Sequence, residues 1–367
     1  MDAYSDYFYN DEGSHGRENE PEGFVNEVKD IIGKTVNCFT LNINGLGWFP
    51  VFDSYAKGKE YIEIDNIPLQ KWVNVILTTQ TRSVDLYIDG KLVPREKAKV
   101  SVYDSGFMLG DGVWEGLRLY NNKWAFCNEH IDRLFEAALA IDLDIGLEKS
   151  EVIEALMMTQ KSNNMTNDAH ARLMITRGPK KRPFQHPALS IDGPTFVIIM
   201  EHSVPKIPRP ISLATVPHLR GLPMTQDPKL NSHSKLNCIL ACIAAEKAGA
   251  DEALMLDING FVNTTNACNF FVVKKDEVWT STGDYCMNGI TRQKVIDICR
   301  AERIPVYEKN FSLVEAYSAD EAFLTGTFGA QTPVGCIDGR TIGTGELGPT
   351  TEHIRELYKL LIEKECR

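Results

Sequence analysis

Long apolar runs, a basic excess and a secretory leader are all missing from this sequence. The apolar runs, such as 196–200, fall far short of the roughly 20 residues that a membrane-spanning helix needs. The net charge is −11, from 39 Lys and Arg against 50 Asp and Glu, which argues against a nucleic-acid backbone or an anionic membrane as partner. No apolar segment follows Met1, and the nine cysteines are scattered and odd in number. We therefore expect a cytoplasmic protein with free thiols.

Metal ligands are also sparse. Cys238 and Cys242 lie four residues apart on an expected helix, and this spacing suits a metal pair. No second pair with suitable spacing accompanies them, so we interpret both cysteines as packing residues and expect no metal ion.

The N-terminal quarter of the chain differs in composition from the rest. Residues 1–22 are rich in Asp, Glu, Asn, Gly and Ser and are expected to be a disordered acidic tail. Residues 23–85 contain short β-rich stretches separated by turns. The part from 67 to 91 resembles a fragment of a laminin-G or concanavalin-like β-sandwich. Because only a fragment is present, we interpret residues 23–85 as a β-rich extension and assign no sugar binding to it.

Strands alternate with amphipathic helices from about residue 86 onward. Apolar side chains recur at helical spacing over 130–140, 236–248 and 292–300, and strand-like runs cover 171–176, 195–200, 253–257 and 270–273. The Pro-rich stretch 204–211 is typical of a linker. The pattern predicts an α+β (α/β) fold with a small N-terminal lobe over 86–203 and a larger lobe over 212–367.

Four motifs occur in a fixed order in the two expected lobes. They are Ile88-Asp-Gly-Lys through Tyr103-Asp-Ser-Gly-Phe to Gly110-Asp-Gly-Val-Trp-Glu-Gly-Leu-Arg118, then Glu129-His-Ile-Asp-Arg-Leu134, then Asn269-Phe-Phe with Gly289-Ile-Thr-Arg292, and finally Thr325-Gly-Thr327 with Thr332-Pro-Val334 and Asp338-Gly-Arg340. In this order they resemble the class-IV aminotransferases, the group of branched-chain and D-amino-acid transaminases. The resemblance implies two lobes with pyridoxal 5'-phosphate (PLP) between them, the larger lobe binding it, and a homodimer that completes each site.

The resemblance also implies a set of cofactor-binding residues. Arg133 resembles the family's phosphate-binding arginine, whose guanidinium matches a phosphate with two parallel hydrogen bonds. Gly289, Ile290 and Thr291 resemble the turn that opens a helix and offers backbone N–H groups to the same phosphate. Thr327 resembles a threonine that contacts the phosphate.

Five further residues resemble the walls of the substrate pocket. Phe328 and Gly329 match a backbone N–H pair that takes the substrate carboxylate, and Trp114 matches an aromatic wall. Arg172 matches an arginine near the substrate, and Arg177 resembles the carboxylate-binding arginine of the D-amino-acid branch. Each arginine has the alternative interpretation of an ordinary surface charge, and Trp114 that of core packing.

The expected cofactor lysine is displaced in this sequence. Laid on the family motif without gaps, the lysine position falls on Asn231. Lys235, four residues later, is our first candidate for the Schiff base, because it opens a helix with Ser232 or Ser234 as N-cap, and a helix N-terminus disfavours a charged ammonium. Lys229, two residues before Asn231, is the alternative, and a protein without a Schiff base is the third possibility.

A second departure concerns the residue that pairs with the pyridine nitrogen of PLP. Thr264 stands where the family has a glutamate, with Thr265 as an adjacent alternative. A hydroxyl hydrogen-bonds but supplies no charge, so the resemblance implies a weaker electron sink.

Three functions fit these observations. The first is transamination of a small or branched-chain amino acid with a 2-oxo acid such as 2-oxoglutarate, supported by the tail that begins at Asp338. The second is another class-IV chemistry, namely D-amino-acid or amine transamination or an aminodeoxychorismate-type lyase. The third is a non-catalytic PLP-fold protein that binds a partner through its N-terminal β segment.

Overall fold

The computed structural model describes residues 84–203 and 209–367, together with two short N-terminal strands. These strands, Cys38–Phe39 (β1) and Val51–Phe52 (β2), pair antiparallel with each other. The chain separates into two compact units, residues 1–83 and residues 84–367. The expected acidic tail, most of the expected β-rich extension and residues 204–208 of the expected linker lie outside the described residues.

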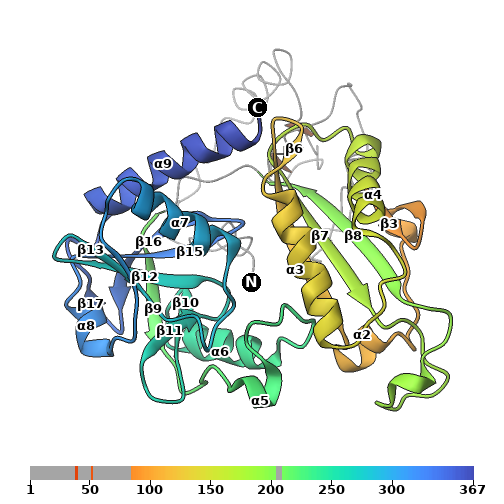
Figure 1. Ribbon diagram of the computed structural model, residues 1–367, viewed down its shortest axis with the longest axis horizontal. Coiled ribbons are helices and arrows are strands. Elements are labelled where there is room, and N and C mark those ends of the chain that lie inside the picture. Colours follow the sequence, from red (N-terminus) through yellow and green to blue (C-terminus); the bar gives the residue numbers. More distant parts are fainter. Residues whose placement is uncertain (1–37, 40–50, 53–83, 204–208) are drawn as a thin grey trace, which may run out of the picture. The chain divides into compact units, whose positions relative to one another are not determined.

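A six-stranded sheet with the order β4-β3-β8-β7-β5-β6 forms the small lobe. Its strands are Asp85–Ile88 (β3), Lys91–Pro94 (β4), Gly112–Tyr120 (β5), Lys123–Trp124 (β6), Ala169–Thr176 (β7) and Thr195–His202 (β8). Its helices are Ser105–Leu109 (α2), Cys127–Ala140 (α3) and Lys149–Ser162 (α4). Figure 1 shows α3 and α4 beside β7 and β8, and buried apolar side chains of these elements, with those of β5, form one core cluster. The opposite face of β5 and β7 is left free of these helices.

Strand β3 belongs to this small-lobe sheet. Tyr87 pairs with Ile198 of β8, and its ring packs edge-on against Phe196 with the centroids 5.2 Å apart. Residues 84–91 were part of the laminin-like resemblance, but their backbone and side chains are committed to the small lobe. Strand β3 therefore belongs to the sheet of the small lobe.

Nine strands form the sheet of the large lobe, along the path β11-β10-β9-β16-β15-β12-β13-β14 with β17 attached to β16. They are Ile211–Thr215 (β9), Glu252–Leu256 (β10), Val262–Thr265 (β11), Asn269–Lys274 (β12), Glu277–Thr280 (β13), Val306–Glu308 (β14), Glu321–Gly326 (β15), Ala330–Ile337 (β16) and Arg340–Thr341 (β17). Strand β11 also pairs with β12, which closes six of the strands into a ring. The sheet mixes parallel pairs, such as β9 with β10, and antiparallel pairs, such as β12 with β15.

Five helices accompany this sheet among the described residues. They are Pro223–Gln226 (α5), Leu236–Lys247 (α6), Ile290–Ala301 (α7), Leu313–Tyr317 (α8) and Pro349–Glu365 (α9). Phe271 and Phe323 stack with centroids 4.9 Å apart and pack with Val295 of α7 and Ile354 of α9 in one buried cluster. Helices α7 and α9 therefore cover one face of the central strands. The predicted α+β class is confirmed, and the helices predicted over 130–140, 236–248 and 292–300 are α3, α6 and α7. Within the described residues no helix has the length and apolarity to cross a membrane.

Candidate functional site

The segment around the expected lysine position runs alongside β5. The Trp114 N–H donates to the Asn231 carbonyl over 3.0 Å, and the Asn231 side-chain amide donates to the Trp114 carbonyl over 2.7 Å. Val113 and Ser232 form an antiparallel bridge. Asn231, which stands at the family's lysine position, is only 2% exposed. Its side chain therefore joins the large lobe to the backbone of β5.

Lys235 lies directly before the first residue of α6, as its N-cap. The expected side-chain cap is wrong, because the Ser234 hydroxyl donates to the Gly110 carbonyl and α6 has no side-chain cap. The Lys235 Nζ lies 5.7 Å from the centre of the Trp114 ring. Burial lowers the pKa of Lys235 to about 8, Cys238 acts in the opposite direction, and the charges of Arg220 and Arg172 act in the same direction as burial. The amine is therefore partly uncharged at neutral pH.

Lys229, the alternative, lies in a different environment. Its side chain is exposed, and its backbone N–H donates to the Asp227 carboxylate over 2.9 Å.

Four side chains share the face of β5 and β7 that α3 and α4 leave free. Arg118 pairs with His170 across the two strands, and Trp114 and Arg172 lie on the same face by strand alternation. The Arg172 guanidinium stacks on the Trp114 ring at 4.0 Å. Arg118 is 2% exposed and donates to the hydroxyl and carbonyl oxygens of Ser203. Burial lowers the pKa of His170 to about 4, with Arg118 contributing.

Two of these residues, Arg118 and His170, were given no role in the sequence analysis. Arg118 follows Trp114 at an even spacing on one strand, and His170 precedes Arg172 by two residues. A period-two reading of each strand places both on the same face as the predicted residues. This face is rich in positive charge, because neither Arg118 nor Arg172 forms an ion pair within the described part of the chain.

Arg133 lies between β5 and the start of α7. Its guanidinium forms two hydrogen bonds with the Glu115 carboxylate, at 2.7 and 2.8 Å, and a third with the Asn288 carbonyl at 3.3 Å. Glu115 also bonds the His130 ring at 2.7 Å, and these two partners keep its pKa low despite burial. Three of the five guanidinium N–H groups are thus used. The remaining two are free to meet an anion beside residue 288.

The N-terminus of α7 follows directly. Gly289 is its N-cap and has no side-chain cap, so the N–H groups of Ile290 and Thr291 open the helix without an internal acceptor. A Cβ on Gly289 would lie 2.4 Å from the Asn269 Oδ1, so only glycine fits there. The predicted phosphate residues Arg133, Gly289, Ile290 and Thr291 therefore gather at one place. Helix N-termini of this kind favour anions.

A row of buried polar side chains crosses the adjoining sheet face. Thr264 pairs with Asn269, Asn269 with Thr325, and Thr325 with Gln331, on the four neighbouring strands β11, β12, β15 and β16. All four residues are buried. The Thr325 hydroxyl and the Gln331 Nε2 have no hydrogen-bond partner among the described residues. Unpaired buried polar atoms are costly, so this polar row is suited to a polar ligand.

The hydroxyl proton of Thr264 is already used in a hydrogen bond. Its Oγ1 donates to the Cys268 carbonyl over 2.6 Å. Thr265 points to the other side, where its hydroxyl meets Glu252 at 2.7 Å and the same Cys268 carbonyl at 3.0 Å. Thr264 therefore offers lone pairs, but neither a proton nor a charge, to a group above the polar row.

The turn between β15 and β16 reaches the small-lobe face. The Phe328 ring lies 5.2 Å from the Arg118 guanidinium and 5.5 Å from the His170 ring, although 59% of the side chain is exposed. Thr327 and Gly329 flank it in the turn. The predicted substrate residues of this turn are thus brought next to Arg118 and His170.

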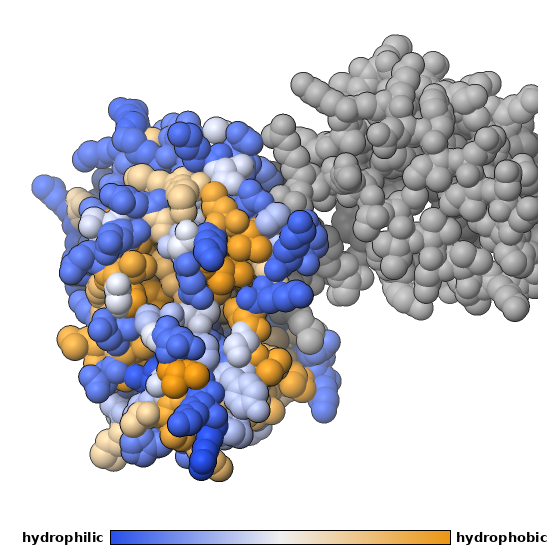
Figure 2. Space-filling model, turned by 90° about the vertical axis from the view of Figure 1, so that its right-hand side faces the viewer, coloured by the Kyte–Doolittle hydropathy of each residue, from blue (hydrophilic) through white to orange (hydrophobic). Residues whose placement is uncertain are grey.

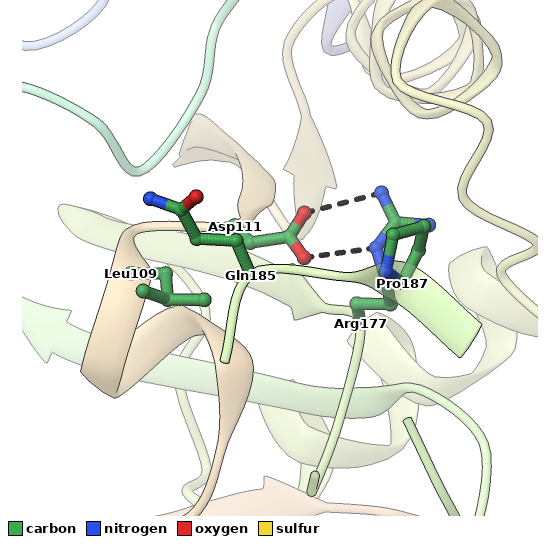
Figure 3. Close-up of a pocket in the computed structure, with 5 residues that line it drawn as sticks. All are labelled: Leu109, Asp111, Arg177, Gln185 and Pro187. Carbon is green, nitrogen blue, oxygen red and sulfur yellow. Dashed lines mark hydrogen bonds and ion pairs between the residues drawn. The ribbon is translucent and has the colours of Figure 1, made fainter. Parts of the chain in front are cut away.

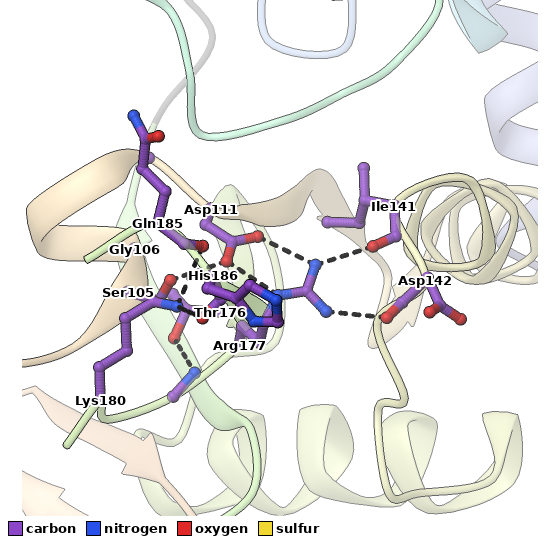
Figure 4. A network of polar contacts seen from close by, with 12 residues as sticks. Ser105, Gly106, Asp111, Ile141, Asp142, Thr176, Arg177, Lys180, Gln185 and His186 are labelled. Atoms are coloured by element: carbon purple, nitrogen blue, oxygen red, sulfur yellow. Dashed lines mark hydrogen bonds and ion pairs between the residues drawn. The ribbon is translucent and has the colours of Figure 1, made fainter. Parts of the chain in front are cut away.

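Arg177 is enclosed by other groups. Figure 4 shows its guanidinium between Asp111 and the backbone of Ile141 and Asp142. It bonds the Asp111 carboxylate at 2.8 and 3.1 Å and the two carbonyl oxygens at 2.7 and 2.8 Å. Asp111 and Arg177 line a pocket with Leu109, Gln185 and Pro187 (Figure 3), which does not include the Lys235 region. Four of the five donor groups of Arg177 are used, so little remains for a substrate carboxylate.

The fold and this geometry define a class of protein: a two-lobed α+β protein with a helix N-terminus suited to an anion, a polar sheet face and a partly uncharged amine. The model of the amino-transferase class IV family matches residues 112–337. The chain belongs to this family.

Relatives with known names agree with this assignment. The branched-chain-amino-acid aminotransferase-like protein 2 of Arabidopsis thaliana is 41% identical over 76% of this chain, and the chain spans only 50% of the length of that relative. A putative branched-chain-amino-acid aminotransferase of Methanocaldococcus jannaschii is 37% identical, covering 75% of this chain and 95% of the relative. The solved branched-chain aminotransferase of the archaeon Thermoproteus uzoniensis with norvaline superposes with a TM-score of 0.70 at 30% identity, over 77% of this chain and 96% of that structure.

Proposed function

We propose that this chain catalyses PLP-dependent transamination of a small or branched-chain amino acid with a 2-oxo acid, and that Lys235 is the lysine that bonds the cofactor. The observation that carries the proposal is the half-buried Lys235 amine, with a pKa of about 8, lying 5.7 Å from the Trp114 ring. Its family membership and the names of its relatives support the reaction type.

The residues present fit PLP. Arg133 and the N–H groups of Ile290 and Thr291 would hold the phosphate, with Thr327 beside them, and the polar row would lie under the ring. When bound, PLP supplies an aldehyde for the amino group and a ring that withdraws electrons. Thr264 would lie beside the ring nitrogen and brings no negative charge that would hold a proton on it.

The protein's own groups would then handle the substrate. The Lys235 Nζ, when uncharged, takes the proton from the substrate Cα and returns it. Arg172 and the backbone of Phe328 and Gly329 would bind the carboxylate of the substrate, and Trp114 would form a wall. We assign Arg177 to holding Asp111 and the end of α3, because its donors are already used.

We also propose that the protein works as a homodimer in the cytoplasm. Apolar side chains reach the surface of the small lobe along the segment before β5: Val100, Val102, Tyr103, Phe107 and Leu109. Figure 2 shows hydrophobic patches among hydrophilic ones on one face of the molecule. Sedimentation equilibrium of the full chain tests this, with a monomeric mass as the contrary result.

Borohydride reduction of the PLP-loaded protein, followed by peptide mapping, tests the lysine assignment. We expect the label on Lys235, no label in Lys235→Ala, and an unchanged label in the matched variant Lys229→Ala. A label on Lys229 would reject the assignment. A protein that gives no cofactor absorbance band with added PLP would favour a non-catalytic role. A panel of amino donors, scored by release of the 2-oxo acid, then decides the substrate.

A further inference from the structure

Arg220 carries a charge that no carboxylate neutralises within the described part of the chain. It lies half-buried in the loop between β9 and α5. Its Nη1 donates to the Cys238 Sγ over 3.1 Å, and its Nε is buried without a hydrogen-bond partner. None of the ion pairs among the described residues includes it. The guanidinium is thus held in place without a counter-ion.

Cys238 places this guanidinium beside Lys235. It is the third residue of α6, three positions after Lys235, and side chains three apart on a helix are neighbours. The backbone of Arg220 is also fixed, because its N–H donates to the Leu256 carbonyl over 2.9 Å. The Cys238 sulfur therefore holds Arg220, a loop residue, near Lys235, the N-cap of α6.

Groups of both signs act on the Lys235 amine. Arg220 and Arg172 of β7 lower its pKa, whereas Cys238 raises it by more than either arginine lowers it, and Glu115 of β5 raises it as well. Glu115 is already bonded to Arg133 and His130. Burial lowers the pKa of the neighbouring His233, so its ring adds little positive charge at neutral pH. Besides burial, Arg220 and Arg172 are therefore the groups that favour the uncharged amine.

A lowered pKa increases the uncharged fraction of the Lys235 amine. Burial is the largest cause that lowers the pKa of Lys235 to about 8, and Arg220 and Arg172 contribute. At pH 7.5 such an amine is uncharged in about a quarter of molecules, against about one in a thousand for an ordinary lysine of pKa about 10.5. Only the uncharged form is a nucleophile or a base.

We propose that Arg220, held by Cys238, is a positioning residue for the reaction, whose charge favours the uncharged form of the Lys235 Nζ. This inference rests on the proposed function, which makes Lys235 the reacting amine. Arg220 itself touches neither substrate nor cofactor in this role.

Competitive acetylation of the full chain with trace acetic anhydride, before PLP is added, tests the inference without the reaction. Mass spectrometry of the Lys235 peptide gives the fraction labelled at each pH. We expect a midpoint near pH 8 in the wild type and a rise of about one pH unit in Arg220→Met. Arg220→Lys, which retains the charge, should restore most of the shift. Lys247→Met, which removes an exposed cation from the far end of α6, should leave the midpoint unchanged.

The outcomes separate the two proposals. A wild-type midpoint near 10.5, or a wild-type midpoint retained in both Arg220→Met and Arg220→Gln, overturns the role of Arg220. Arg220→Gln keeps a donor toward Cys238 and serves if Arg220→Met does not fold. Borohydride label on a lysine other than Lys235 rejects the proposed function, while the acetylation midpoint still decides whether Arg220 acts on the Lys235 amine.

Discussion

Replacing Lys235 by Met should make the cofactor-free protein more stable at neutral pH, and the gain should shrink in alkali. The folded pKa of Lys235, about 8, lies below the ordinary lysine value of 10.5. Between these two values the unfolded chain binds the proton more tightly than the folded chain does. The stability of the wild type therefore rises with pH across this window, and the variant lacks this rise.

The magnitude follows from the size of the shift. A difference of about 2.5 pH units corresponds to about 3 kcal/mol at pH 7, and about 1 kcal/mol of it remains at pH 10. The stability advantage of Lys235→Met over the wild type should therefore shrink by about 2 kcal/mol between pH 7 and pH 10. Titrations common to both proteins cancel in this comparison.

Urea unfolding of both proteins at pH 7, 8.5 and 10, followed by tryptophan fluorescence, measures the difference. The free energies are compared at equal m-values. Lys247→Met, on the exposed end of the same helix, serves as the control and should show no such pH dependence. A difference between Lys235→Met and the wild type that stays constant or grows from pH 7 to pH 10 would refute the reasoning.

Three further variants test other contacts. Arg177→Met breaks the paired bonds to Asp111 and should lower the free energy of unfolding by about 2 kcal/mol while leaving the KM for the amino donor unchanged; a tenfold rise in KM would restore the substrate role. Glu115→Gln leaves Arg133 without its carboxylate and should weaken PLP binding by about tenfold in a fluorescence titration; unchanged affinity would contradict this. Because Thr264 gives the ring nitrogen no charge, a PLP analogue with CH in place of that nitrogen should retain 2-oxo acid release within about tenfold. A thousandfold loss would show that another group charges the nitrogen.

The fold class, several helices and the closeness of Arg133 to the start of α7 could be predicted from the sequence. The spacing of apolar residues predicts α3 and α6, because residues on one face of a helix recur at helical spacing along the chain. This prediction needs no knowledge of distant residues. Arg133 and Gly289 each lie in a short motif that can be found in the sequence alone. The fold then brings both residues to the start of α7.

The roles of individual charges were decided by the tertiary structure. A motif marked Arg177 as a substrate arginine, but Asp111 and two carbonyls at the end of α3 take its donors. Arg220 was not singled out in the sequence, because its significance comes from Cys238 on another element. The polar row from Thr264 to Gln331 exists only after four strands adopt their register.

What the sequence determined by itself was therefore which elements form, which side of each faces a core, and to which family the chain is similar. The tertiary structure decided which charges are paired, which polar atoms lack a partner among the described residues and which lysine has its pKa lowered. The physical reason is that the two kinds of effect act over different distances along the chain. Helix and strand periodicity acts over a few residues, whereas burial and charge compensation depend on groups that only the packed lobes bring together.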